Sequence, residues 1–372
     1  MVLKLGKSEL RIEKKEKKKE SVLASLLGAL MALALAFLVA GVIISMSGAN
    51  PVEAISTMVI GAFGSKRMIG ETLVKATPLM LGAAGLIIAY RCGMISIGTE
   101  GQIVIGGIFA TIAGLALTGT PRIVALPLVM IAAGIGGGIW GAIPGILKAK
   151  LGVSEVINTI MLNYIAIYTL SYLVDKPLRE PPGHFPQSAM IAETARLNIL
   201  LPGTRLHTGL ILALLSVVLV YLLMWRSPIG YQMRAVGYSQ TAAKNAGIPI
   251  ARNMVLSMLL SGVFAGLAGA MEVAGMHHRL MNAFSTDMGF DALAVALLGK
   301  LHPAGIVVSS ILFGALRVGA NMMQRTVQVP ASLVQVIQGL VIIFVLMDTF
   351  LKNYAVSLVS RGKAALNKGG QA

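Results

Sequence analysis

Long apolar stretches recur along the whole sequence and leave the chain little choice of environment. The first runs from Val22 to Met46 behind a basic N-terminal stretch, and the last covers about residues 332–351. About 20 consecutive apolar residues are enough to span the hydrocarbon core of a bilayer as a helix. Because lipid cannot satisfy backbone hydrogen bonds, such segments must be helical. The pattern predicts an all-α, polytopic transmembrane bundle with about ten spans, some of them broken or re-entrant.

Charge and cysteine content narrow the possible function classes. Hydrophobic residues make up 56% and charged residues 12% of the 372 residues, whereas about a quarter of a soluble domain is charged. The single cysteine, Cys92, excludes an internal disulfide framework and a cysteine cluster for a metal. The net charge of +16 lies mostly in the N-terminal tail and in loops expected on one side of the membrane. We therefore expect membrane lipid, and no nucleic acid, to meet this charge.

The basic residues also orient the chain. Residues 1–20 are expected to form a cytoplasmic basic tail, residues 21–351 the transmembrane domain, and residues 352–372 a cytoplasmic C-terminal tail. An even number of crossings places both termini in the cytoplasm, with the longest external loop at residues 175–208. The predicted spans cover about residues 22–46, 77–90, 103–117, 123–147, 156–174, 210–225, 254–274, 290–298, 304–322 and 332–351.

The region before the second span is expected to lie outside. Residues 47–75 are mixed in polarity and predict an external interfacial segment, after which the span starts at Pro78 in its first turn. Seven basic residues fall outside in this arrangement, against the general trend: Lys66, Arg67, Lys75, Arg122, Arg179, Arg196 and Arg205.

One polar stretch, residues 226–252, interrupts the hydrophobic pattern of the second half. Ser239 suits the N-cap of a helix, and the following residues contain no helix breaker. Gly247 suits the left-handed position after a helix, and Pro249 prevents continuation. A helix of about seven residues is only about 10 Å long and marginal alone in water, so another surface must hold it.

This predicted helix presents small side chains on one side, where a partner could approach closely. Arg234 and Lys244 supply positive charge beside that side. From spacing alone, an ordinary basic loop between two spans explains the stretch equally well. The small residues are Ala235, Ser239, Ala242, Ala243 and Ala246.

Acids within the apolar segments are a second signal, because an ionised aspartate at mid-bilayer costs about 2.5 to 3.5 kcal/mol. Glu100 and Gln102 lie in a glycine-rich break, Glu272 near the end of the seventh span, and Asp291 at the start of the short eighth. These acids either line a polar pathway or lie near an interface, where each pairs with a neighbour such as Arg317.

Two asparagines in the fifth span, Asn158 and Asn163, are further pathway candidates. They are five residues apart and do not share a helix face well, so at most one is expected to point squarely into a pathway. Either could instead make a hydrogen bond across helices.

Several catalytic signatures are absent from the sequence. It has no Gly-x-x-x-x-Gly-Lys-Ser/Thr phosphate loop, nucleophile elbow, His-Glu-x-x-His motif or cysteine pair. His277 and His278 have no carboxylate at the spacing that would complete a metal site on a helix. The chain is therefore not expected to be an enzyme or to bind a metal or cofactor. Any ATP and Mg²⁺ must be bound by a separate subunit.

Four blocks resemble the permease subunits of bacterial ATP-binding-cassette importers for simple sugars, nucleosides and branched-chain amino acids. The first three are Gly93–Gly106, Thr159–Ile165 and Gly230–Ile248. The fourth, His277–Pro303, is similar to the nucleoside branch in particular.

The resemblance implies a subunit of an importer in a bacterial inner or plasma membrane that moves nucleosides, or a related ribose or simple sugar. It implies cytoplasmic ATP-binding-cassette subunits, a second permease subunit, identical or not, and an external solute-binding protein or lipoprotein as partners. The third block resembles the loop through which such permeases contact their ATPase. Its candidate residues are Gly230, Arg234, Ala235, Gly237, Ser239, Ala242, Ala243, Lys244 and Gly247. The alternative is a secondary transporter or channel for a small polar solute that works without an ATPase.

Overall fold

The computed structural model describes residues 3–5, 8–10, 35, 37–46, 48–181, 183, 185–328, 333, 335, 336, 339, 340 and 343. Within these residues, seven helices are long and apolar enough to cross a membrane. They are α3 (Lys66–Arg91), α4 (Thr99–Ala116), α5 (Arg122–Leu151), α6 (Glu155–Asp175), α7 (Gly209–Tyr221) with the π-helix η2 (Leu222–Arg226), α10 (Ile250–Ala270) with the π-helix η3 (Met271–His277), and α12 (Pro303–Val327). The prediction of a polytopic helical bundle is confirmed.

Shorter elements complete the described part. They are the strands β1 (Leu3–Leu5) and β2 (Ser8–Leu10), a helical segment at Phe37–Met46, α2 (Pro51–Phe63), the 3₁₀ turn η1 (Glu193–Ala195), α8 (Pro228–Tyr238), α9 (Gln240–Asn245) and α11 (Met288–Leu298). The two strands pair antiparallel within the predicted basic tail. The start of the predicted first span, almost all of the tenth, and the C-terminal tail lie outside the described residues.

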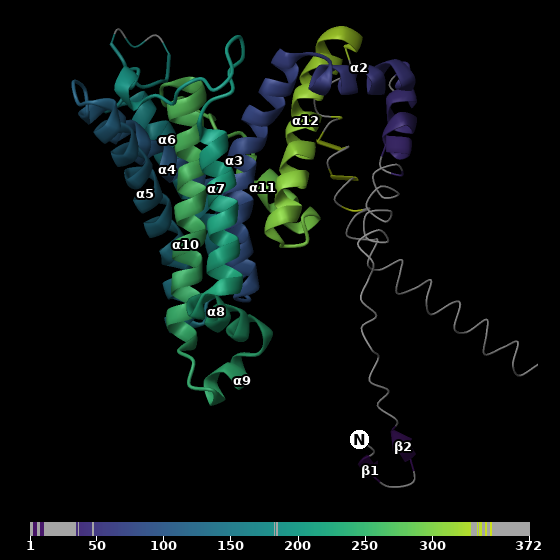
Figure 1. Cartoon of the computed structure of the whole chain (residues 1–372), viewed down its shortest axis with the longest axis vertical. Helices are drawn as coiled ribbons and strands as arrows, with labels where there is room; N and C mark the ends of the chain where they lie inside the picture. Colours follow the sequence, from purple (N-terminus) through teal and green to yellow (C-terminus); the bar gives the residue numbers. More distant parts are fainter. Residues whose placement is uncertain are drawn as a thin grey trace, which may run out of the picture.

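The bundle is built around α10, which packs against α3, α4 and α5, while α12 packs against α2, α3 and α11. The loop between α6 and α7 lies at one end of the bundle, and α8 and α9 lie at the other (Figure 1). This arrangement fits the predicted separation of the long loop and the polar stretch onto opposite sides of a membrane.

Helix α3 starts earlier than the sequence predicts. Ser65 caps it by accepting the Met68 N–H at 3.2 Å, so the helix begins at Lys66 and not at Pro78. Pro78 lies in the helix interior, where the loss of its N–H costs one backbone hydrogen bond. Residues 66–75 therefore belong to a spanning helix and not to an interfacial segment. Lys75, which was expected outside, points its ammonium group at the Glu272 carboxylate, 3.9 Å away.

Glycines let α5 and α10 approach at backbone contact. A Cβ atom on Gly137 would lie 2.3 Å from the Gly262 carbonyl oxygen, and one on Gly266 would lie 2.2 Å from the Ala133 carbonyl oxygen. Both distances are far shorter than any van der Waals contact. Close packing of this kind is a main source of helix association in lipid, where the hydrophobic effect between helices is absent.

A matched pair of substitutions on α5 tests this packing. Gly137→Ala should destabilise the protein by about 1 to 3 kcal/mol, because the new methyl group pushes two backbones apart. Gly134→Ala, one turn away, should be nearly neutral, since its Cβ would meet nothing closer than the Val263 side chain at 3.4 Å. Thermal unfolding in detergent would compare them, and equal melting temperatures would contradict the contact.

Candidate functional site

The polar stretch after η2 folds into two short helices at one end of the bundle (Figure 1). Ser227 caps α8 by accepting the Gly230 N–H at 3.1 Å, and Ser239 caps α9 by accepting the Ala242 N–H at 3.3 Å. Gly247, just after α9, has a φ of +73°, the left-handed conformation that favours glycine. The prediction of a short helix capped by Ser239 and followed by Gly247 is confirmed.

The open side of α9 differs from the prediction at two residues, Ala235 and Ala243. Ala235 lies on the preceding helix α8 and is half-buried. Ala242, Lys244 and Ala246 are exposed, but Ala243 is only 2% exposed and belongs to the main hydrophobic core. Its carbonyl also accepts the Ile248 N–H at 3.0 Å. The prediction that Ala243 lies on the open side is therefore wrong. Ala243 holds α9 to the rest of the subunit, which supplies the support that so short a helix needs.

Helix α8 packs directly against the C-terminal end of α3. A Cβ atom on Gly237 would lie 2.2 Å from the Arg91 carbonyl oxygen, and Gly93, with a φ of +80°, faces the Gly237 backbone. At its other end, a Cβ on Gly230 would lie 2.1 Å from the Leu223 carbonyl oxygen in η2. Arg234, one of the two basic residues predicted beside the open side of the short helix, lies on α8 and is half-buried. The backbones of α8 and of the end of α3 are therefore in direct contact.

Arg91 extends this contact to the loop between α11 and α12. Its guanidinium donates to the Leu301 carbonyl oxygen, at 3.0 Å from Nη2 and 3.3 Å from Nε. The same group lies 5.4 Å from the centre of the Trp225 ring in η2, within range of a cation–π interaction. The sequence marks Arg91 only as the end of a span, because its partners are far away along the chain.

Glu100 joins α4 to the segment around the start of α11. The Gly289 N–H donates to its Oε2 at 2.6 Å, and the Ser285 hydroxyl donates to its Oε1. The carboxyl group is almost fully buried, with 3% of the residue exposed. Because a buried acid needs partners, these two donors account for its position inside the bundle.

The glycine-rich break before α4 is held by α6. Asn163 accepts the Gly101 N–H at 2.9 Å and donates its amide to the Ile97 carbonyl oxygen at 2.9 Å. Thr159, one turn earlier, accepts the Ile97 N–H at 3.3 Å. Irregular backbone at membrane depth requires such partners. Asn163 is therefore occupied in supporting the break.

Asn158 and Gln102 lie close to the same break but are not fully paired. Gln102 is 1% exposed, and its side-chain oxygen has no hydrogen-bond partner among the described residues. The amide nitrogen of Asn158 likewise lacks one within that part of the chain. Buried polar atoms without partners are uncommon and mark places where water or a ligand can bind.

Asp291 on α11 pairs with Arg317 on α12, with 2.8 Å between Oδ2 and Nε. Arg317 also donates to the Thr286 carbonyl oxygen at 2.8 Å. This pair is one of the alternatives that the sequence leaves open. Together with Glu100, it fixes both ends of the segment that leads into α11.

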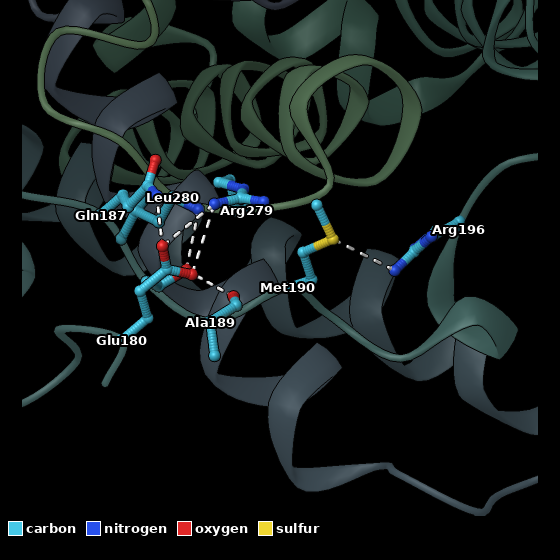
Figure 2. A network of polar contacts seen from close by, with 8 residues as sticks. Glu180, Gln187, Ala189, Met190, Arg196, Arg279 and Leu280 are labelled. Atoms are coloured by element: carbon cyan, nitrogen blue, oxygen red, sulfur yellow. Dashed lines mark hydrogen bonds and ion pairs between the residues drawn. The ribbon is translucent and has the colours of Figure 1, made fainter. Parts of the chain in front are cut away.

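At the opposite end, the loop after α6 folds over the segment that follows η3. Arg279 Nη1 is 3.3 Å from the Glu180 carboxylate (Figure 2), and Gln187 forms an isolated antiparallel bridge with Met281. Figure 2 also shows Arg196, on the same loop, pointing at Met190. A pocket of about 560 Å³ opens here. Its basic lining residues are Arg196, Arg205, His277, His278 and Arg279.

A buried charge cluster lies beneath this pocket. Glu272 in η3 is 1% exposed, and its Oε2 lies 3.3 Å from His277 Nε2 in addition to its contact with Lys75. The sequence places Glu272 near the end of the seventh span, as a pathway residue or as an acid paired with a neighbour, and in the structure it has two cationic or potentially cationic neighbours. Within the described part of the chain, no three metal-ligating side chains gather as a metal site would require.

His207 lies next to this cluster, in the outer loop and outside the membrane-spanning helices. The residue is 2% exposed, and its Nδ1 accepts the Gly209 N–H at 3.2 Å. Burial lowers the pKa of His207 from 6.5 to about 4, although the nearby Glu272 opposes the shift. The imidazole is therefore neutral in the folded protein at pH 5 to 7.

This pKa predicts a loss of stability in mild acid. Below pH 6.5 the unfolded chain binds a proton at His207 that the folded chain does not, so unfolding becomes easier until about pH 4. The effect reaches about 3 kcal/mol at pH 4. His207→Asn, whose Oδ1 can accept the same N–H, should lose less stability between pH 6.5 and 4.5 in detergent melts. Parallel curves for the two proteins would contradict this.

Comparison with known proteins adds evidence that the geometry does not contain. Residues 68–346 match the family model described as branched-chain amino acid transport system / permease component. The chain is 39% identical over 315 residues to the guanosine ABC transporter permease protein NupP of Bacillus subtilis (strain 168), covering 83% of this chain and 89% of NupP. It is 34% identical over 318 residues to the nucleoside ABC transporter permease protein NupB of Lactococcus lactis subsp. cremoris (strain MG1363), covering 83% and 87%.

Two further relatives bear on the solute and on assembly. The glucose ABC transporter permease protein TsgB13 of Haloferax volcanii is 33% identical over 333 residues, covering 87% of each chain. A second guanosine permease of Bacillus subtilis, NupQ, is 24% identical over 254 residues, covering 66% of this chain and 79% of NupQ. Since the family model covers most of the chain and several relatives match it almost end to end, this multi-pass membrane protein belongs to the family of permease components of branched-chain amino acid transport systems.

Proposed function

We propose that this chain is the membrane-spanning permease subunit of an ATP-driven importer that moves nucleosides, or a related ribose or simple sugar, into the cytoplasm. The observation that carries the proposal is the pair of short capped helices, α8 and α9, seated on the inner end of α3. ATP and Mg²⁺ are then bound by a partner subunit. The chain lies in the inner or plasma membrane of a bacterium, with both termini in the cytoplasm.

The surface that receives the ATPase is formed by α8 and α9. Its small exposed residues, Ala242 and Ala246, allow close approach, and Lys244 adds charge beside them. Two aromatic side chains that the sequence pattern does not single out, Tyr231 and Tyr238, are 64% and 82% exposed on α8. Exposed tyrosines are frequent anchors of protein interfaces, which supports an interface at this end.

The second permease subunit is a different chain in this proposal. NupP and NupQ are both named as guanosine permeases of one organism, and this chain is clearly more similar to NupP. A system with two unequal permeases, of which this chain is the NupP-like one, accounts for both similarities. Outside, the solute-binding protein or lipoprotein docks on the loop at residues 175–208 and beside the basic pocket.

The solute pathway runs past the break before α4. Glu100 and Gln102 start α4, Asn163 faces it from α6, and Asp291 lies on the neighbouring α11. Asn158 lies five residues before Asn163, on a different side of α6. Amide and carboxyl groups suit an uncharged solute rich in hydroxyl groups.

Transport then follows from a two-state motion. ATP binding closes the ATPase subunits and displaces α8 and α9, and the Gly237 contact carries this motion into α3. Arg91 passes it to the loop between α11 and α12, so the pathway alternates between facing outward and facing inward.

Reconstitution of the complete complex tests the proposal. Proteoliposomes with this chain, its paired permease, the ATPase and the binding protein should accumulate radiolabelled guanosine only with ATP present. A competition series with ribose and glucose would rank the solutes. Full uptake by this chain alone without ATP would instead support a secondary transporter or channel.

A further inference from the structure

Helix α6 exposes a row of aromatic side chains that its own subunit does not cover. Tyr164, Tyr168 and Tyr172 are 55%, 70% and 63% exposed, and their spacing of four residues places them on one face. Only 22% of the most apolar window of α6 is buried, the lowest fraction among the seven spanning helices of the described part. The inward face carries Thr159 and Asn163, which hold the break before α4.

The depth of two of these tyrosines argues against lipid as their surroundings. Tyr164 and Tyr168 lie nine and thirteen residues into a helix of 21 residues, about 14 and 20 Å along its axis of about 31 Å. Lipid-facing tyrosines gather at the two membrane interfaces, where the hydroxyl meets water. Within the described part of the chain, no hydrogen bond is made by either hydroxyl group, and a hydroxyl group without a partner is costly to place in hydrocarbon.

The other exposed helix faces look different. On α5 the exposed large side chains near mid-helix are aliphatic, such as Ile131, Ile135 and Ile139, and α7 exposes leucines and valines there. These faces suit lipid. The face of α6 is distinguished from them by its aromatic rings and hydroxyl groups at mid-depth.

We propose that the tyrosine face of α6 lines the water-filled solute path, where Tyr164 and Tyr168 stack on the flat ring of a nucleobase. This rests on the proposed function, and it narrows the solute to the nucleoside alternative, an aromatic heterocycle carried on a sugar. Tyrosine binds such a ring through its π face and a hydroxyl through its own hydroxyl, at low entropic cost. The path is completed by the facing permease subunit.

Single-cysteine labelling tests the proposal directly. Cys92 is the only cysteine and is buried, and its thiol donates to the Asn253 carbonyl oxygen, so Cys92→Ser keeps a donor in a cysteine-free background. Tyr168→Cys and the control Ile135→Cys, which is 51% exposed in the native protein and also lies near mid-helix, are then placed in the complete complex. A charged methanethiosulfonate reacts with thiolates, which form in water and not in lipid.

Tyr168→Cys should react at least about tenfold faster than Ile135→Cys, and guanosine should slow the reaction. Tyr168→Leu should lower guanosine uptake by about tenfold, while Tyr168→Phe retains it, because the ring supplies the stacking. If the two cysteines are labelled slowly and at the same rate, the proposal is overturned. That result is expected if residue 168 faces lipid or a dry contact with another subunit. Labelling without protection by guanosine would overturn the solute contact.

The two levels of inference fail differently. Labelling needs no ATP-driven uptake, so a wild-type complex that accumulates none of guanosine, ribose and glucose with ATP would refute the proposed function even if Tyr168→Cys reacts. Normal uptake by the wild-type complex, together with an unreactive Tyr168→Cys, would refute only the proposal that the tyrosine face lines the solute path.

Discussion

Ala242→Glu should abolish ATP-driven uptake while the subunit still folds and inserts. Ala242 is exposed on α9, so in the isolated subunit the new carboxylate points into solvent and disturbs nothing. In the proposed complex it would be buried against the ATPase, where a carboxylate without a partner loses its hydration. Loss of a central interface contact costs about 2 kcal/mol or more. Association with the ATPase should therefore weaken by about 30-fold, measured by co-purification at controlled concentration.

Two further variants separate this effect from misfolding. Ala242→Ser keeps a small side chain at the same position and should retain ATPase binding and uptake. Ala243→Glu places the same carboxylate one residue on, in the core, where an unpaired charge is very costly, so the protein should be lost before assembly. If Ala242→Glu binds the ATPase normally, α9 is not the contact helix.

The contrast between Ala242 and Ala243 shows how far the sequence reaches. Caps are local, so Ser239 and Gly247 identify α9 and its ends from a handful of neighbouring residues. The direction in which a helix of six residues faces depends on what it packs against, and no periodicity can be read from so few residues. The helix was therefore predictable, and its buried side was not.

Misplaced boundaries have a similar cause. Pro78 suggests a helix start because proline suits the first turn. Helix α3, which is 26 residues long, nevertheless contains Pro78 in its interior. Packing against α10 and α12 stabilises the helix despite the missing hydrogen bond, and sequence patterns near Pro78 do not report that packing.

Contacts between distant residues were the least predictable part of the candidate site. Arg91 and Leu301 are 210 residues apart in sequence, and Glu100 and Gly289 are 189 apart. The sequence nominates Glu100 because an acid in an apolar segment is unusual, but it does not reveal the partner. Arg91 was not singled out as a site residue because an arginine at the end of a span has an ordinary explanation in membrane topology.

Asp291→Leu should be among the most destabilising single substitutions in the bundle. It leaves the Arg317 guanidinium without its carboxylate, and breaking such a pair costs about 3 to 5 kcal/mol when both groups are buried. The two side chains are 15% and 23% exposed, so we expect the lower end, about 3 kcal/mol. The melting temperature in detergent should fall accordingly.

Adding Arg317→Met to Asp291→Leu should restore most of this stability, because an apolar pair of similar volume avoids the desolvation of two charges. Restored folding then permits a test of the role of Asp291 in transport, uncomplicated by misfolding. If Asp291 contributes a carboxylate to the pathway, the double variant folds but takes up little guanosine in the complete complex. If it recovers full uptake, the carboxylate serves only to hold α11 against α12, and the pathway must be drawn through Glu100, Gln102 and α6 without it.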